Sequence, residues 1–176
     1  MNKINIKEII RPTLTLFIIC IAAALALSLS NLATADKIAE NEQNTLSDAM
    51  RDVLTADIYD AVEIDSNGGD TALYKAVSGS ETVGYTALCT KNGYGGKIKV
   101  MVDINNDGTV NKVAVISADD ETPGLGQNVK TDDFLSRFEG VNSASDVDAW
   151  TGATISSTAV KGAVNEAIEL YNQYKD

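Results

Sequence analysis

The stretch Asp148-Ala-Trp-Thr-Gly-Ala-Thr154 ends in a hydroxyl that could carry chemistry. An amphipathic run follows it, with apolar residues at one-, three- and four-residue steps, the period of a helix with one buried face. A hydroxyl of Ser156, Ser157 or Thr158 can cap the first turn of this helix. A phosphate group on Thr154 would then lie near a helix N-terminus, where free amides and the dipole favour negative charge.

Two glycine-rich stretches lie upstream. Gly93-Tyr-Gly-Gly96 permits positive φ or a close approach of the backbone. In Glu121-Thr-Pro-Gly-Leu-Gly126 the proline fixes one φ, and the glycines let Leu125 project from a tight loop. This second stretch is not a dinucleotide fingerprint, because no third glycine follows at the required spacing. Taken alone, the first stretch is also typical of a flexible hairpin loop, and TGATISS is also typical of a Thr/Ser-rich loop and cap.

In this order, the three stretches resemble the FMN-binding domain family. That family includes the G subunit of Rnf electron-transport complexes and the C subunit of the sodium-pumping NADH:quinone reductase. The resemblance covers roughly residues 70 to 170 and the membrane segment. It implies that FMN is attached to Thr154 through a phosphodiester bond. It also implies that Asp148 belongs to the pattern recognised by a separate flavin transferase, which uses FAD and a divalent metal.

The resemblance further implies that loops from all three stretches hold the flavin, with Leu125 and backbone groups covering its ring. The predicted flavin-binding residues are Tyr94, Gly95, Glu121, Thr122, Pro123, Gly124, Leu125, Gly126, Asp148, Thr151, Gly152, Ala153 and Thr154. Trp150 could shield or stack on the ring, although a lone tryptophan more often belongs to the core. Many family members carry a histidine two residues before the glutamate, where this chain has Asp119, so a role of that histidine is not transferable.

The composition excludes several kinds of site. The chain has no histidine, and its only cysteines are Cys20 and Cys89. A CxxCH haem site, a four-cysteine cluster, a His/Cys zinc site and a Ser-His-Asp triad therefore cannot form within one chain. The string from Asp103 begins like a calcium loop, but Ala114 stands where that loop needs a bidentate glutamate. The sequence predicts no metal site, and redox chemistry would need an organic cofactor such as a flavin.

One segment near the N-terminus is long and apolar enough to span a membrane. Leu14 to Leu32 are mostly apolar, and their number is close to the roughly 20 residues that span a bilayer. Three basic residues precede the segment: Lys3, Lys7 and Arg11. The positive-inside rule therefore predicts a single-pass protein of the cell (inner) membrane, with a cytoplasmic N-terminus and an external domain after Asp36. The chain carries a net charge of −11, which predicts that it does not bind nucleic acid.

A cleavable signal peptide is the alternative for this segment, because Ala33-Thr-Ala35 has the small-x-small form of a cleavage site. The apolar run is longer than the usual core of a signal peptide, which favours a retained anchor. Cys20 lies in this run and Cys89 in a predicted strand, so we expect no disulfide between them. Cys89 is expected to be a small buried hydrophobic residue.

The fold class predicted from these patterns is α+β, an antiparallel sheet with packed helices, preceded by one transmembrane helix. The expected boundaries are 1–12 for a cytoplasmic N-terminus, 13–35 for the anchor, 36–70 for a helical connector and 71–176 for the FMN-binding domain. The expected helices are Lys37 to Leu54, a short one that Thr131 caps and that runs through Phe138, and roughly Ser157 to Tyr174. The expected strands are Ala72–Val77, Thr82–Thr90, Ile98–Ile104 and Val110–Ile116, with a turn at Ser66–Gly69.

Three functional hypotheses follow. The first is an electron-carrying subunit with covalent FMN in a Rnf-type complex, whose partners are other membrane subunits and the flavin transferase. Such a complex couples electron transfer from ferredoxin to NAD+ to ion translocation. The second is a stand-alone flavoprotein anchored in the membrane. The third is a non-redox binding module, in which Thr154 only caps a helix. The residues offer no general acid/base set, so an electron carrier is favoured over a free-standing catalyst.

Overall fold

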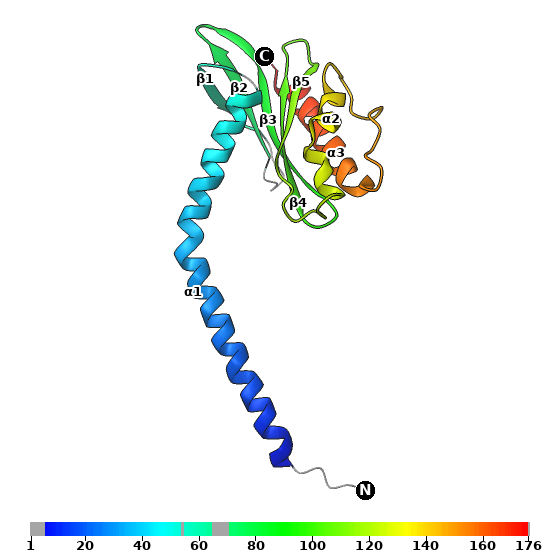
Figure 1. Cartoon of the computed structure of the whole chain (residues 1–176). Coiled ribbons are helices and arrows are strands. Elements are labelled where there is room, and N and C mark those ends of the chain that lie inside the picture. Colours follow the sequence, from blue (N-terminus) through cyan, green and yellow to red (C-terminus); the bar gives the residue numbers. More distant parts are fainter. Residues whose placement is uncertain (1–5, 54, 65–70, 176) are drawn as a thin grey trace. The chain divides into compact units, whose positions relative to one another are not determined.

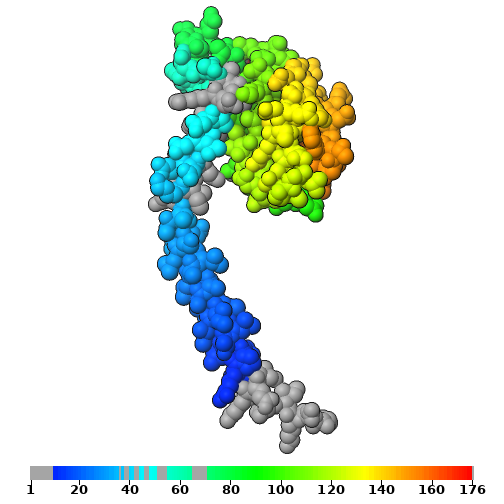
Figure 2. All heavy atoms as spheres, viewed as in Figure 1, coloured from blue at the N-terminus to red at the C-terminus, as the bar shows by residue number. Residues whose placement is uncertain are grey.

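The computed structural model describes residues 6–53, 55–64 and 71–175, and the chain divides into two compact units, 1–44 and 45–176. Helix α1, Ile6–Val53, contains the candidate membrane span Ile10–Ala35. This span has a mean hydropathy of 2.3, and its side chains stand uncovered along the helix (Figure 2). The predicted anchor and the predicted helix from Lys37 thus belong to one continuous helix, while Leu54 lies outside the described residues.

Five strands form the sheet of the second unit: β1 Ile58–Val62, β2 Ala72–Ser78, β3 Glu81–Asn92, β4 Lys97–Ile104 and β5 Val110–Ser117. They are all antiparallel and follow one another in the order β1-β2-β3-β4-β5 (Figure 1). The four predicted strands are confirmed, with ends extended by a few residues at most. Strand β1 falls inside the range predicted for the connector, so pairing begins before residue 71. The predicted turn at Ser66–Gly69 lies outside the described residues.

The side chains of β4 alternate between the two faces of the sheet, and both faces are covered. Ile98, Val100, Val102 and Ile104 are fully buried in the main core. Met101 points to the other face, where it packs with Met50 from the end of α1 and with residues such as Leu88. Because successive side chains of a strand point to opposite faces, this one strand supplies both layers.

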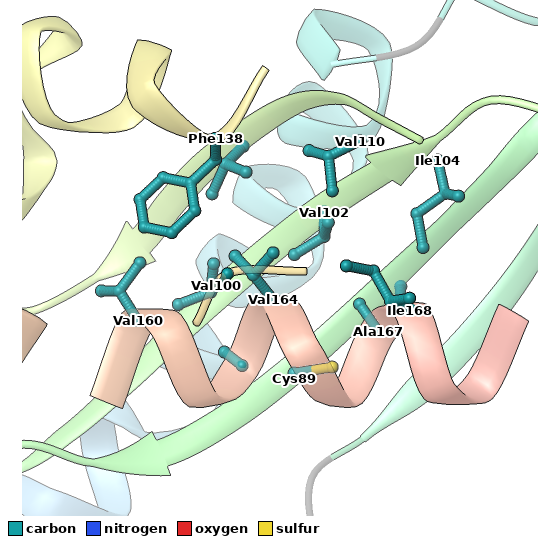
Figure 3. Packing of buried hydrophobic residues seen from close by; sticks show 14 of the residues in the cluster. Cys89, Val100, Val102, Ile104, Val110, Phe138, Val160, Val164, Ala167 and Ile168 are labelled. Atoms are coloured by element: carbon teal, nitrogen blue, oxygen red, sulfur yellow. The ribbon is translucent and has the colours of Figure 1, made fainter. Parts of the chain in front are cut away.

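Helix α3, Thr154–Tyr174, covers the first face. Figure 3 shows its apolar stripe against β4, with Val160, Val164 and Ile168 directed at the strand. Cys89 of β3 is buried here and both cysteines are free, as expected from the sequence. The fold is therefore α+β, and the α3 contact with β3 and β4 holds the start of the helix against the loop between these strands.

Three short elements lie between β5 and α3: η1 Gly126–Lys130, α2 Asp132–Leu135 and η2 Ser136–Phe138. The helix expected from Thr131 to Phe138 is thus one α-turn followed by a tighter 3-10 turn. Thr131 stands at its N-cap position, but its hydroxyl donates to the Asn128 carbonyl oxygen at 2.7 Å and does not cap the helix. The α2 segment and α3 lie on the same side of the sheet (Figure 1).

Candidate functional site

Thr154 is the first residue of α3, three positions earlier than the helix start predicted from the sequence. The N-cap position belongs to Ala153, whose side chain makes no capping hydrogen bond. The first amides of a helix have no partner within it. An anion attached to the exposed Thr154 hydroxyl would therefore lie beside free donors at the positive end of the helix dipole.

The predicted serine cap is wrong, because the two serines of the first turn bond to other parts of the chain. The Ser157 hydroxyl donates to the Ala153 carbonyl oxygen at 2.8 Å and accepts from the Trp150 backbone N–H at 3.0 Å. The Ser156 hydroxyl donates to Glu121 Oε2 at 2.5 Å. Both serines are buried, and together they fix the entry of the chain into α3.

Gly152 lets the chain turn into this helix. Its φ of +83° lies in the left-handed region, where any residue with a Cβ is strained. A Cβ at this position would also come 3.3 Å from Leu125 Cδ2, so the two motifs approach each other closely here. The small residues that precede Thr154 therefore bring its hydroxyl next to the loop of residues 121–126.

Glu121 joins three segments that are far apart in the sequence. Its side chain is 2% exposed, although it is a carboxylate. Oε1 accepts from the Gly95 backbone N–H at 2.9 Å, and Oε2 accepts from Ser156 on α3. The buried carboxylate thus holds the β3–β4 loop, its own loop and the first turn of α3 together.

Hydrogen bonds stabilise the charged form of Glu121. Desolvation alone would raise the pKa of this carboxyl, but donors oppose that effect and the net result is a pKa below the usual glutamate value. The donors are the Ser156 hydroxyl and the backbone N–H groups of Gly95, Gly96 and Tyr94. A carboxylate that accepts several such bonds stays ionised even when buried.

The glycines of the β3–β4 loop let its backbone lie close to Asp120 and Glu121, and this role does not require positive φ. None of them adopts a left-handed conformation. A Cβ on Gly95 would overlap the Asp120 carbonyl oxygen, and one on Gly96 would come 2.6 Å from Asp120 Oδ2. Larger residues would therefore push this loop away from Glu121 and widen the space beside Thr154.

A cavity of about 520 Å³, called cavity A, opens between these segments. It is lined by Tyr94, Glu121, Thr122, Leu125, Gly126, Gly152, Ala153, Thr154, Ile155 and Ser156. Its size is within the range of small-molecule sites, about 300 to 1,000 Å³. Helix α3 contacts η1, and in Figure 2 the yellow surface of the segment that contains η1 lies next to the orange surface of residues near 150.

Large apolar side chains are exposed around cavity A. Tyr94 is 71% exposed, Ile155 54% and Leu125 49%, and each comes from a different segment of the site. A soluble surface rarely gathers such side chains without a ligand or partner. They form an apolar rim beside the Thr154 hydroxyl.

A smaller cavity of about 320 Å³, called cavity B, meets cavity A at Thr154 and Ile155. Its other lining residues are Lys91 and Asn92 at the end of β3, and Thr158, Ala159 and Gly162 on α3. The Thr154 hydroxyl therefore stands at the junction of two cavities. Apart from Thr154, none of the flavin-binding residues predicted from the sequence lines this second cavity.

Eight of the thirteen predicted residues line cavity A, and five do not. Gly95 lies behind it as the donor to Glu121, while Pro123, Gly124 and Thr151 are exposed and absent from its lining. Asp148 lines a separate polar hollow together with Arg137. Contact of any of these residues with a flavin stays a prediction.

Two lining residues of cavity A were not predicted as flavin contacts, Ile155 and Ser156. The burial of Ser156 could have been predicted from the sequence. It lies four residues before Val160 and seven before Ala163, on the buried stripe of the helix. A hydroxyl on an apolar stripe needs a buried partner. The identity of that partner, Glu121, could not be read from the helix pattern.

Two further residues singled out in the sequence lie outside the cavity. Trp150 packs edge-on against Phe134, with ring centroids 6.3 Å apart, and Arg137 lies over its ring. It therefore belongs to the packing of the core. Asp119 pairs with Lys130 at 2.7 Å on the surface, where that lysine holds the pKa of the aspartate below its usual value.

The residues present fit a flavin. A planar, largely apolar ring matches the rim of Tyr94, Leu125 and Ile155, since aromatic rings gain from such contacts. The hydroxyl at the edge of the cavity offers a point of attachment for a phosphate, beside the first amides of α3. The buried carboxylate that shapes the cavity is satisfied by donors of the protein itself.

Comparison with known proteins identifies two matched regions. The chain matches the FMN-binding domain family over residues 93–169 and the RnfG N-terminal region over residues 1–53. The solved structure of NqrC from Shewanella oneidensis is 18% identical, with a TM-score of 0.49, and the match covers 65% of this chain and 68% of that chain.

Curated relatives cover nearly the whole chain. The G subunit of the proton-translocating ferredoxin:NAD(+) oxidoreductase complex of Clostridium ljungdahlii is 30% identical over 93% of this chain and 91% of that protein. The G subunit of the Na(+)-translocating ferredoxin:NAD(+) oxidoreductase complex of Acetobacterium woodii is 33% identical over 96% of this chain and 94% of that protein. With both of its regions matched, this chain belongs to the family of G subunits of ion-translocating (Rnf) oxidoreductase complexes and contains an FMN-binding domain.

Proposed function

We propose that this chain carries FMN covalently on Thr154 and serves as an electron-carrying subunit of a Rnf-type complex. In such a complex, electron transfer from ferredoxin to NAD+ is coupled to ion translocation across the membrane. The observation that carries the proposal is the exposed Thr154 hydroxyl at the first residue of α3, at the edge of a cavity with an apolar rim. The kind of complex is inferred from the names of the relatives, which are G subunits of ferredoxin:NAD(+) oxidoreductase complexes.

Attachment needs a second protein, a flavin transferase that uses FAD. The Thr154 hydroxyl loses its proton to solvent as a bond forms between Oγ and the phosphorus of the FMN half; the pyrophosphate bond of FAD breaks, and AMP leaves. Because Thr154 is exposed, the transferase can reach its hydroxyl without opening the fold. The product is a phosphodiester, which keeps one negative charge beside the helix N-terminus.

The bound flavin supplies redox chemistry that no side chain of this chain provides. The residues around it hold and shield it. Tyr94, Leu125 and Ile155 offer apolar contacts for its ring, while Glu121 fixes the loops that carry two of them. Because attachment is covalent, an external domain keeps its redox group through many turnovers.

The orientation in the membrane is also a proposal. Lys3 and Lys7 precede the candidate span Ile10–Ala35, and Arg11 is its second residue, which favours a cytoplasmic N-terminus. The domain with Thr154 then lies on the outer side of the membrane. In a Cys20→Ser background, a cysteine placed at Ser80, in the exposed β2–β3 turn, should react with a membrane-impermeant maleimide in intact cells. Labelling only after lysis would contradict this orientation.

The main test is intact mass of the chain co-expressed with an active flavin transferase. We expect a mass gain of one FMN less one water, and its complete loss in Thr154→Ala. Ser80→Ala, which removes another exposed hydroxyl of the domain, is the matched control and should keep the gain. Thr154→Ser should keep part of it, because the hydroxyl remains.

The outcomes separate the hypotheses. A wild-type chain that neither gains mass beside a transferase shown to be active nor binds FMN non-covalently would leave only a non-redox module. A flavinylated chain that co-purifies with no other membrane subunit would favour a stand-alone carrier over a complex subunit. Co-purification with further subunits, together with ferredoxin-dependent NAD+ reduction that Thr154→Ala abolishes, is the result we expect.

A further inference from the structure

Cavity A has one charged group in its wall. Among the described residues that line this cavity, Glu121 is the one with a charged side chain. The side chain is buried, and its two oxygens accept hydrogen bonds from the Gly95 N–H and the Ser156 hydroxyl. The protein itself therefore supplies the donors that keep this carboxylate ionised and in place. A ligand in the cavity meets a negative charge that is already fixed.

Little separates this carboxylate from the cavity. Gly126 lines the cavity beside it, and a Cβ on Gly126 would come 2.6 Å from Glu121 Oε2. The backbone also lies close to Oε1, which a Cβ on Gly93 would overlap. The carboxylate is thus enclosed by backbone and has little water around it, while Tyr94 and Leu125 add apolar surface to the same cavity. A charge in such surroundings is screened less than one at the surface.

We propose that Glu121 lowers the reduction potential of the flavin, because its carboxylate in the wall of cavity A disfavours the negative charge that the ring gains on reduction. Charge near the ring is one of the means by which a protein tunes a flavin. This inference rests on the proposed function, because it concerns the same bound flavin.

The charge balance of flavin reduction gives the direction of the effect. At alkaline pH the ring takes up two electrons and one proton, so the reduced ring carries one more negative charge than the oxidised ring. A carboxylate at a separation of about 10 Å, in surroundings between water and a protein interior, disfavours this change by about tenfold in the equilibrium constant. For a two-electron couple, a factor of ten lowers the potential by about 30 mV.

Other charges near the site stay constant when Glu121 alone is changed. Lys91 lines cavity B and pairs with Glu166, and Asp120 is exposed to water. The phosphodiester on Thr154 and the first amides of α3 also act on the ring. Because wild-type protein and a Glu121 variant share all of these groups, a difference in potential between them reports the Glu121 carboxylate.

The test is the midpoint potential of the flavin in the full chain, flavinylated by co-expression with the transferase and purified in detergent. The protein is titrated at alkaline pH without oxygen, with dithionite as the electron donor and redox dyes as references. Glu121→Gln removes the charge and keeps the size of the side chain. We expect its potential to lie about 30 mV above that of wild type. Equal potentials would overturn the inference.

Two variants separate the charge of Glu121 from its structural role. Ser156→Ala removes one hydrogen bond to the carboxylate but keeps the charge, so its potential should not rise. Asp119→Asn removes an equal charge that is exposed and lines neither cavity, and it should leave the potential unchanged. A rise in Ser156→Ala as large as that in Glu121→Gln would show that the contacts, and not the charge, set the potential. Thermal unfolding of each variant shows whether the fold is retained.

A second measurement uses wild-type protein alone and does not depend on the folding of a variant. Below a certain pH the reduced ring binds a second proton, and the potential then falls by about 60 mV per pH unit, twice the slope at higher pH. A fixed carboxylate favours this protonation, so the change of slope should lie about one pH unit above that of free FMN. A change of slope at the pH of free FMN, or below it, would overturn the inference.

The outcomes also separate this inference from the proposed function. A flavinylated chain in which neither measurement shows an effect of Glu121 would overturn only the role of this carboxylate. A wild-type chain that neither gains mass beside an active transferase nor binds FMN would overturn both.

Discussion

Two buried carboxylates of this domain, Glu121 and Asp103, differ in what surrounds them. Glu121 is 2% exposed and Asp103 1%, yet the pKa of Glu121 lies below its usual value while that of Asp103 is raised to about 6. Glu121 accepts hydrogen bonds at both oxygens. Asn111 donates to Asp103 Oδ2 and the Ile104 backbone N–H also lowers the Asp103 pKa, but Oδ1 has no hydrogen-bond partner among the described residues.

Burial alone therefore does not set the charge of a carboxyl group. Desolvation is the largest influence on both residues, and hydrogen-bond donors decide the net direction. The donors are concentrated at Glu121, beside Thr154. At Asp103, on the other face of the sheet, the buried hydroxyl of the cross-strand neighbour Thr86 also lacks a hydrogen-bond partner among the described residues. Glu121, at the site, therefore has donors for both of its oxygens. Asp103, on the opposite face of the sheet, lacks a partner for one oxygen among the described residues, so its burial is energetically unfavourable.

Removal of the Glu121 carboxylate should have the largest effect. Glu121→Ala leaves the Ser156 hydroxyl and the Gly95 N–H without their acceptor, and we expect a loss of about 3 to 5 kcal/mol in the free energy of unfolding, measured with urea. Glu121→Gln, which keeps one acceptor oxygen, should lose less. Equal stability of Glu121→Ala and wild type would show that this carboxylate does not hold the loops.

Ser156→Ala should have the next largest effect, because it removes one hydrogen bond to a charged group. We expect a loss of about 1.5 to 3 kcal/mol and a raised pKa of Glu121. Since a lowered carboxyl pKa stabilises the fold above the unfolded value and this effect is lost in acid, the variant should show a weaker acid-dependent loss of stability.

Carbon-13 NMR of the Glu121 carboxyl gives its pKa in both proteins directly. Thr158→Ala, which removes an exposed hydroxyl half a turn later on the same helix, is the control for stability. A Glu121 pKa that is the same in Ser156→Ala and wild type would show that the serine does not stabilise the charged form.

Removal of the Asp103 charge should act in the opposite direction. Because its folded pKa of about 6 exceeds the usual value of 3.8, the folded protein binds the proton more tightly than the unfolded chain. Stability therefore falls as the pH rises from about 4 to 6, and then stays level. Asp103→Asn should remove this slope and stabilise the domain at pH 7 by about 1 to 2 kcal/mol. Urea unfolding at several pH values measures it, and an unchanged slope in Asp103→Asn would contradict the assignment.

The smallest effect should come from a carboxylate on the surface. Asp119 pairs with Lys130, but its side chain is 78% exposed, and exposed ion pairs contribute little. Asp119→Asn should therefore change the urea midpoint little, and any change should vanish at high salt. It should not alter the extent of flavinylation, because Asp119 does not line either cavity. A large loss of flavin in this variant would show that the position contributes to the site.

Much of the fold could be predicted from local patterns. The alternation of Ile98, Val100 and Val102 indicated a strand, and the Asn-Asp-Gly turn after it indicated a hairpin. The stripe of Val160 and Val164 indicated the buried face of α3. These signals repeat every two or every three to four residues, so neighbours in the sequence are sufficient to reveal them.

The start of α3 and the shape of the cavity depended on contacts between distant residues. Ser156 was a possible cap in the sequence, but packing of α3 on the sheet placed it against Glu121, 35 positions away. The same packing placed Lys91 and Thr154 on the lining of one cavity and Asp148 on that of a different hollow. No periodicity encodes such distances.

Composition and local patterns were sufficient to predict the candidate membrane segment, four of the strands and the closing helix, and they suggested Thr154 as an attachment residue. The role of Glu121 in joining the loops and the two cavities that share Thr154 became visible only in the folded chain. The physical reason is that a buried charge is tolerated only where donors converge on it, and those donors come from segments that meet only after α3 packs on the sheet.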